Sequence, residues 1–330
     1  MGYLHIENLY RPIAQTILLF RECYALEKIH GTSAHLTFNF TSNDSWAVKF
    51  FSGGESNSKF VSLFNQEQLL AAVKELGIPI DKEITVYGEA YGGSQQGMSH
   101  TYGKQLKFIV FDVQVGDVWL SVPDAEDVAK KLGLEFVHYE KVSTDLSVLD
   151  AFRDRPSIQA IRNGVSEHLP AGDDRESTVV CSAGGFKQGE NCWFMGRVLI
   201  NARKQEGVVL RPLVEMKLNN GNRVITKHKG DDFKETATAR PVVDPAQLQV
   251  LSEANAIANE WVTNTRLEHV LQKLPAPHDM SLIPQLIKAM TEDVLREGEG
   301  EIVVSDAAKK AIGKKAVELF KGFLNSQISK

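Results

Sequence analysis

The chain has 330 residues, of which 43% are hydrophobic and 24% are charged, and its formal net charge is −5. These values are typical of a globular protein with room for a catalytic domain and a smaller second domain. They exclude a protein that is basic throughout, so any surface for nucleic acid must be local.

The N-terminal segment predicts no signal peptide, because it lacks a basic start followed by an apolar core. No apolar run is long enough to span a membrane. We therefore expect a cytoplasmic protein. The sequence leaves the oligomeric state open, with a monomer among the options.

The first 240 residues predict a mixture of strands and helices. Alternating apolar residues over 23–51, with a turn signal at Asn43-Asp44, predict a β-hairpin. A helical pattern over 64–77 ends at Gly77. Further elements follow in chain order: strands at 83–91 and 106–120, a helix at 123–133, and two strands within 206–229 joined by a turn at 219–221.

The pattern becomes helical after Pro241. Helices are expected over 246–273, 279–297 and 305–327, separated by prolines and glycines. We therefore expect an α+β domain over 1–240 and a small all-helical domain over 241–330. The last 22 residues contain six lysines and one acidic residue, so the helix over 305–327 is either a contact for a phosphate backbone or a solvated lysine face.

Lys28 is the first candidate for chemistry. It begins the segment KIHG beside an apolar, strand-like run, and a neutral lysine amine can attack phosphorus and hold a nucleotide covalently. The pattern Lys-x-x-Gly says little alone, because an exposed lysine explains most matches. It also begins at Lys74, Lys130, Lys227 and Lys310.

Three acidic or aromatic positions follow Lys28, each with two explanations. Glu89 lies among glycines at a strand end, where it either accepts a ribose hydroxyl or belongs to a solvated turn. Phe111, before an acid in an apolar strand, either stacks on a purine or packs in the core. Glu206, before a buried strand, either binds a divalent metal or is a strand-edge charge.

Lys227 and Lys229 are two residues apart in the last strand of this region, so their side chains point to one face. Two ammonium groups on one face repel each other unless an anion joins them, and a triphosphate would do so. A solvated lysine face is the alternative.

In this order, the segments resemble the covalent nucleotidyltransferases, which include polynucleotide ligases and messenger-RNA capping enzymes. The match covers residues 27–235. His30, two residues after Lys28, and the segments YGEAYGG, FIVFD and EGVVLRP resemble the ATP-dependent RNA ligases of the RNA ligase 2 and RNA-editing ligase family. The resemblance implies a nucleotidyltransferase (adenylation) domain of antiparallel sheets flanked by helices.

The resemblance also implies a role for each matched residue. Lys28 would attack the α-phosphorus of ATP and become a lysyl-adenylate, with Glu27 and Ile29 beside the adenine. The other assignments are Glu89 to the ribose, Phe111 to adenine stacking, Glu206 to Mg²⁺ or Mn²⁺, Lys227 and Lys229 to the phosphates, and His30 to ligation.

Two positions depart from the family pattern. Ser33 stands where the family has asparagine, and Lys49 lies in the strand where the family has arginine. These two residues are the candidates for gripping the 5′-phosphate of the substrate. A lysine cannot form the bidentate phosphate clamp that an arginine forms.

The resemblance implies an ATP-dependent ligase that seals 3′-hydroxyl and 5′-phosphate ends of RNA, in a nicked duplex or at free ends. A DNA ligase or a guanylyltransferase is the first alternative. Both usually carry an oligonucleotide-binding barrel after the paired lysines, and the helical pattern after residue 241 argues against one. A non-catalytic nucleic-acid-binding protein is the second, and the intact Lys28, Glu206 and lysine pair count against it.

Overall fold

A computed structural model of the chain describes residues 2–42, 45–170, 186–243 and 250–328. The chain divides into two compact units, Met1–Gly230 and Asp231–Lys330. This division falls ten residues before the boundary expected from the sequence. The intervening segment belongs to the second unit because its Ala237 N–H and Arg240 guanidinium bind Glu260.

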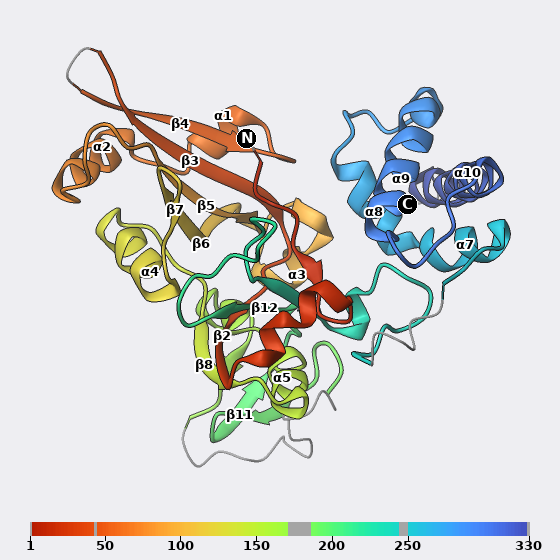
Figure 1. Cartoon of the computed structure of the whole chain (residues 1–330), viewed down its shortest axis with the longest axis horizontal. Coiled ribbons are helices and arrows are strands. Elements are labelled where there is room, and N and C mark those ends of the chain that lie inside the picture. Colours follow the sequence, from red (N-terminus) through yellow and green to blue (C-terminus); the bar gives the residue numbers. More distant parts are fainter. Residues whose placement is uncertain (1, 43–44, 171–185, 244–249, 329–330) are drawn as a thin grey trace. The chain divides into compact units, whose positions relative to one another are not determined.

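One five-stranded sheet of the first unit has the order β1-β13-β12-β2-β8 (Figure 1). Its strands are β1 (Glu7–Asn8), β13 (Thr226–Lys229), β12 (Gly207–Pro212), β2 (Glu22–Glu27) and β8 (Tyr139–Ser143). β1 pairs with β13 in parallel, and the other neighbours are antiparallel. The sheet therefore brings the chain's N-terminal segment beside the paired-lysine strand.

The second five-stranded sheet has the order β4-β3-β5-β6-β7. Its strands are β4 (Trp46–Ser52), β3 (Thr32–Phe40), β5 (Ile84–Tyr91), β6 (Lys107–Val115) and β7 (Val118–Trp119). β3 and β4 form the antiparallel pair that the alternating pattern predicts. The expected Asn43-Asp44 turn lies outside the described residues. Residues 23–27 belong to β2 in the other sheet, so the predicted hairpin begins nine residues too early.

Helices cover the second sheet where the sequence predicts them. α2 (Gln66–Glu75) packs against β4, and α4 (Val122–Lys131) packs against β6 (Figure 1). Asn65 caps α2 by accepting a hydrogen bond from Gln68 N at 3.2 Å, and Ser121 caps α4. The first unit also contains 3-10 helix η1 (Pro12–Leu19) and the helices α1 (Asn57–Val61), α3 (Ser99–Tyr102), α5 (Leu146–Arg153) and α6 (Ile158–Arg162).

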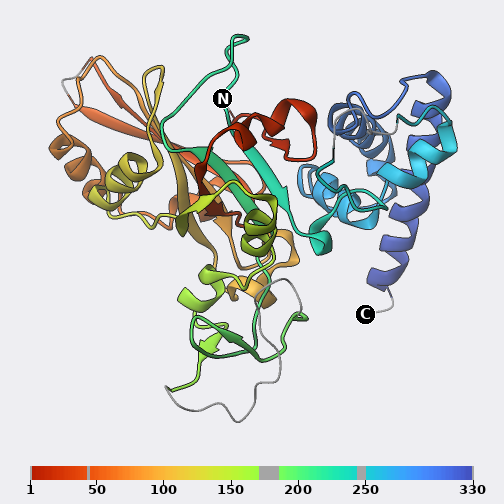
Figure 2. The same cartoon turned by 60° about the horizontal axis from the view of Figure 1, so that its bottom comes forward.

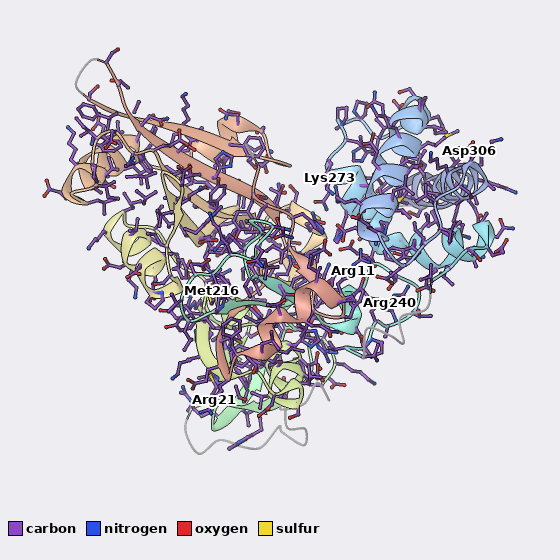
Figure 3. All side chains as sticks on the ribbon, viewed as in Figure 1. Arg11, Arg21, Met216, Arg240, Lys273 and Asp306 are labelled. Carbon is purple, nitrogen blue, oxygen red and sulfur yellow. The ribbon has the colours of Figure 1, made fainter. Side chains whose placement is uncertain are left out.

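A small three-stranded sheet completes the described part of the first unit (Figure 2). It consists of β10 (Cys192–Phe194), β11 (Arg197–Ile200) and β9 (Glu167–His168). The loop between β12 and β13 contains the turn predicted at 219–221, where Gly221 has a φ of +85°. Met216 on this loop is exposed (Figure 3).

The second unit is helical, as the sequence predicts. Its helices are α7 (Ala254–Trp261), α8 (Asn264–Gln272), α9 (Ile283–Glu297) and α10 (Asp306–Ile328). The expected helix over 246–273 is broken at Thr263, whose hydroxyl caps α8 by accepting from Arg266 N. Residues 244–249 lie outside the described part. Ile312, Ala316 and Phe320 of α10 are fully buried in the core of this unit.

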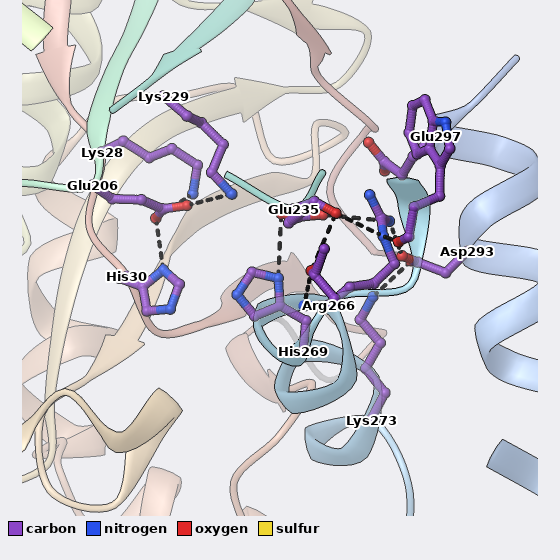
Figure 4. Close-up of polar contacts among 12 residues, drawn as sticks. Lys28, His30, Glu206, Lys229, Glu235, Arg266, His269, Lys273, Asp293 and Glu297 are labelled. Atoms are coloured by element: carbon purple, nitrogen blue, oxygen red, sulfur yellow. Dashed lines mark hydrogen bonds and ion pairs between the residues drawn. The ribbon is translucent and has the colours of Figure 1, made fainter. Parts of the chain in front are cut away.

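The second unit also contains a buried ionic cluster (Figure 4). Arg266 is 1% exposed, and its guanidinium pairs with Asp293 at 2.5 Å and with Glu235 at 3.5 Å. His269 also contacts Glu235. Among the described residues, no helix combines the length and the apolar character that crossing a membrane requires.

Candidate active site

Three neighbouring strands bring the predicted lysines and Glu206 together. Lys28 directly follows β2, and its N–H donates to the Gly207 carbonyl at 2.9 Å. Gly207 begins β12 and lies opposite Lys229 on β13. The order β2-β12-β13 therefore joins Lys28 to Glu206, although the two are 178 residues apart in the chain.

Glu206 lies at the centre of this cluster (Figure 4). Its Oε2 is 2.8 Å from Lys28 Nζ and 3.0 Å from His30 Nδ1, and its Oε1 is 3.0 Å from Lys229 Nζ. Burial alone would raise the pKa of the Glu206 carboxyl, but the Lys28, Lys229 and His30 side chains hold it well below its usual value. Glu206 is therefore an ionised carboxylate that aligns the three basic side chains.

The glycine of the Lys-x-x-Gly segment is required by a close approach to β5. A Cβ atom on Gly31 would lie 2.3 Å from the Ala90 carbonyl oxygen and 2.9 Å from Tyr91 Cβ. The Gly31 N–H donates to Glu89 Oε1 at 3.1 Å. Gly31 thus allows the chain to pass from β2 to β3 while Lys28 stays beside Glu89.

The carboxyl group of Glu89 has a raised pKa. Burial is the main cause that raises its pKa to about 8; nearby Glu206 acts in the same direction, and Lys28 opposes both. Two carboxyl groups with opposite pKa shifts therefore lie close to Lys28.

A cavity of about 240 Å³ opens beside these residues. Its lining includes seven residues that the sequence selected: Glu27, Lys28, Ile29, Ser33, Glu89, Phe111 and Lys227. Ser33 Oγ is buried and has no hydrogen-bond partner in the part of the chain that the structure describes. The structure therefore gathers most of the sequence-selected residues around one pocket.

The remaining selected residues lie outside the lining. His30, Glu206 and Lys229 form the adjoining ionic cluster. Along β13, half-buried Lys227 and Lys229 alternate with buried Thr226 and His228, which agrees with a shared face for the two lysines. Lys49 is exposed on β4 opposite Thr37 and does not line the cavity.

Sequence reasoning missed one wall of the cavity, which is formed by Tyr3, Leu4, His5 and Ile6. The Tyr3 ring contacts the Phe111 ring edge-on, with centroids 4.9 Å apart. This wall depends on the pairing of β1 with β13, and no pattern in the N-terminal residues themselves signals it.

A buried ion-pair network lies behind Phe111. Asp112 is fully buried and binds Arg211 at 2.9 Å, Arg223 at 2.6 Å and the Tyr3 hydroxyl at 2.6 Å. Removing one partner from such a network leaves an uncompensated buried charge. The network joins β6, β12 and the N-terminal wall of the cavity.

The donor set fits a divalent cation that also binds phosphate oxygens. Within the described ranges, no three His, Cys, Asp or Glu side chains gather as a metal site. Mg²⁺ usually binds one or two carboxylates together with substrate phosphates, so such a group is not required. Glu206, whose pKa is held well below its usual value, would supply an ionised carboxylate for such a cation.

A family model described as RNA ligase matches residues 21–229, which is more than half of the chain. The matched range includes Glu206 and the three basic residues around it, Lys28, His30 and Lys229. The chain therefore belongs to the RNA ligase family. A comparison with curated proteins finds no match.

Solved structures of Naegleria gruberi RNA ligase are among those similar to this chain. A mutant with ATP and Mn is 12% identical, with a TM-score of 0.43, over 71% of this chain and 56% of that chain. A mutant with AMP and Mn is also 12% identical, with a TM-score of 0.43, and the match covers 71% of this chain and 57% of that chain. The ligase with PPi is 13% identical, with a TM-score of 0.44, and the match covers 71% of this chain and 57% of that chain. The match thus spans little more than half of the Naegleria ligase.

Proposed function

We propose that this chain is an ATP-dependent RNA ligase that seals 3′-hydroxyl and 5′-phosphate ends. The observation that carries the proposal is the Lys28–Glu206–Lys229 cluster at the edge of a cavity lined by Glu27, Glu89 and other sequence-selected residues. Membership of the RNA ligase family supports RNA as the substrate.

In the first step, the neutral Lys28 amine attacks the α-phosphorus of ATP. A nitrogen–phosphorus bond forms, the bond from the α-phosphorus to the bridging oxygen breaks, and pyrophosphate leaves. The Lys28 nitrogen releases a proton to solvent as the new bond forms. Lys227 and Lys229 stabilise the negative charge that develops on the phosphates. Glu206 orients the Lys28 and Lys229 side chains.

In the second step, an oxygen of the RNA 5′-phosphate attacks the phosphorus of the AMP group, and the nitrogen–phosphorus bond to Lys28 breaks. In the third step, the RNA 3′-hydroxyl attacks the activated 5′-phosphate, and AMP leaves. His30, which contacts Glu206 at 3.0 Å, would act in these ligation steps.

We also propose nucleotide contacts for further residues that line the cavity. Glu89 would accept a hydrogen bond from the ribose, Phe111 would stack on adenine, and Glu27 and Ile29 would flank the base. Ser33, with its unpartnered hydroxyl, would bind the 5′-phosphate. Lys49 is exposed outside the cavity, so a 5′-phosphate role for Lys49 requires the RNA to extend along β4.

Mg²⁺ or Mn²⁺ held by Glu206 would neutralise phosphate charge during these transfers. The exposed lysines of α10 would contact the RNA backbone.

A sealing assay tests the proposal. A nicked RNA duplex with a labelled 5′-phosphate is incubated with the protein, Mg²⁺ and either ATP or GTP, in parallel with a nicked DNA duplex. We expect sealing of RNA with ATP only. Sealing that prefers DNA or GTP would assign the chain to another nucleotidyltransferase, and no sealing under any of these conditions would contradict the proposal.

A further inference from the structure

The Glu27 carboxylate is held by hydrogen bonds that no sequence motif indicates. Glu27 ends β2, directly before Lys28, and its side chain is 2% exposed while it lines the cavity. Its Oε1 accepts a hydrogen bond from Ser157 Oγ at 2.5 Å, and its Oε2 accepts one from Gln159 N at 3.1 Å. The Gln159 N–H also lies within 3.4 Å of Oε1, so the Ser157 hydroxyl and the Gln159 N–H together fix the direction of the carboxylate.

Ser157 itself is fixed on two sides. It is fully buried as the N-cap of α6, and its Oγ accepts a hydrogen bond from Ala160 N at 3.0 Å. Its N–H donates to the Arg203 carbonyl at 2.6 Å. Because Oγ accepts from the backbone of α6, its single hydroxyl proton is left to donate to Glu27.

Gln159 is equally constrained. Its side chain is fully buried, and its Nε2 donates to the Tyr91 hydroxyl at 2.9 Å and to Glu135 Oε1 at 3.1 Å. The Gln159 N–H that binds Glu27 therefore belongs to an immobilised residue. The two donors together leave the other lone pairs of the Glu27 carboxylate for a ligand in the cavity.

We propose that Ser157 is a positioning residue for nucleobase selection, which orients the Glu27 carboxylate to accept a hydrogen bond from the exocyclic amine of adenine and to repel the carbonyl oxygen of guanine. This inference rests on the proposed function, because it places the base of ATP beside Glu27. Ser157 acts through Glu27 and does not touch the nucleotide.

The charge state of Glu27 gives Ser157 a second effect. Burial raises the pKa of Glu27, and the hydrogen bond from Ser157 opposes this increase. Loss of the hydroxyl would favour the protonated carboxyl group, which can donate a hydrogen bond to the carbonyl oxygen of guanine. Ser157→Ala should therefore weaken ATP binding and lower the ratio of ATP affinity to GTP affinity.

Isothermal titration of the full chain with ATP and with GTP, in EDTA so that no chemistry occurs, tests this inference. The proteins are wild type, Ser157→Ala, Glu27→Ala and the double variant. Ser166→Ala is the matched control, because Ser166 is also buried and donates to a backbone carbonyl, that of Asn201, without touching Glu27.

We expect Ser157→Ala to lower the ratio of ATP to GTP affinity roughly tenfold, as for loss of a hydrogen bond to a charged group. On the Glu27→Ala background the same change should have no further effect on the ratio, because the two residues act as one unit. Ser166→Ala should leave the ratio unchanged, even if both serine variants melt at lower temperature than wild type.

An unchanged ratio in Ser157→Ala, an equal shift in Ser166→Ala, or an additive effect in the double variant would overturn the inference. Incubating the same proteins with labelled ATP and Mg²⁺ separates this outcome from failure of the proposed function. If wild type forms no protein-linked AMP but binds ATP selectively through Ser157, the ligase proposal fails and the positioning role stands.

Discussion

At the scale of single residues, the site contains two buried carboxyl groups in opposite charge states. Glu206 is surrounded by three basic side chains and stays ionised. Glu89 has a pKa of about 8, because burial outweighs the attraction of Lys28. In the proposed function, a Glu89 that is protonated near neutral pH would limit the negative charge that the phosphates of ATP meet.

The raised pKa of Glu89 predicts a pH-dependent stability. Between the unfolded value of 4.5 and about 8, the folded protein binds this proton more tightly than the unfolded chain does, so the free energy of unfolding falls as pH rises. Glu89→Gln removes this contribution. Its stability relative to wild type should therefore increase from pH 5 to pH 8, by at most about 1.4 kcal/mol per pH unit. Urea denaturation at several pH values measures this difference, and parallel curves for the two proteins would contradict the assignment.

Local sequence motifs were sufficient to select several of the candidate site residues. Lys28, Glu89, Phe111 and Lys227, which local segments singled out, line one cavity. Tyr3 could not be predicted, because it reaches the site through a non-local strand pairing. Ser157 could not be predicted either, because its hydrogen bond to Glu27 joins residues 130 positions apart.

At the scale of elements, the arrangement of the strands creates the site. β2, β12 and β13 are neighbours in one sheet, so the lysine, glutamate and paired-lysine segments meet at one edge. Local patterns predicted α2, α4 and β5 to within two residues, because caps and alternation are local signals. They could not show that β2 and β3 belong to different sheets, since this depends on partners far away in the chain.

The passage between these sheets depends on Gly31. Gly31→Ala should lower the free energy of unfolding by about 1–3 kcal/mol, because the added methyl group would overlap the Ala90 carbonyl and force the strands apart. Gly2→Ala is the control, since a Cβ at that position has nothing within 4 Å. Chemical denaturation of both variants measures the effect. Equal stability of Gly31→Ala and wild type would show that the chain crosses between the sheets differently.

At the scale of the whole molecule, the two units have different expected tasks. The first contains every residue assigned to the nucleotide, and the second presents exposed lysines on α10. Lys310, Lys314 and Lys321 follow a helical spacing that places them on one face. The net charge of −5 conceals this local basic surface.

A triple variant tests the role of this surface. Replacing Lys310, Lys314 and Lys321 with alanine should weaken RNA binding and reduce the salt dependence of binding by about one unit of slope for each lysine that binds a phosphate in the wild type. Nucleotide transfer to the protein should not change. Fluorescence anisotropy with labelled RNA at several salt concentrations measures the slope. As a control, Lys74, Lys130 and Lys131 are replaced together in the first unit, and an equal decrease of slope there would argue against a specific role for α10.

In the proposed function, Lys28 carries the nucleotide. The most direct test is peptide mapping by mass spectrometry after incubation of the full chain with α-labelled ATP and Mg²⁺, for wild type, Lys28→Ala and Lys74→Ala. Lys74 is the matched control, because it begins another Lys-x-x-Gly segment, on α2. We expect AMP on Lys28 in wild type and in Lys74→Ala, and no adduct in Lys28→Ala. AMP attached to another residue, or an adduct that persists in Lys28→Ala, would contradict it.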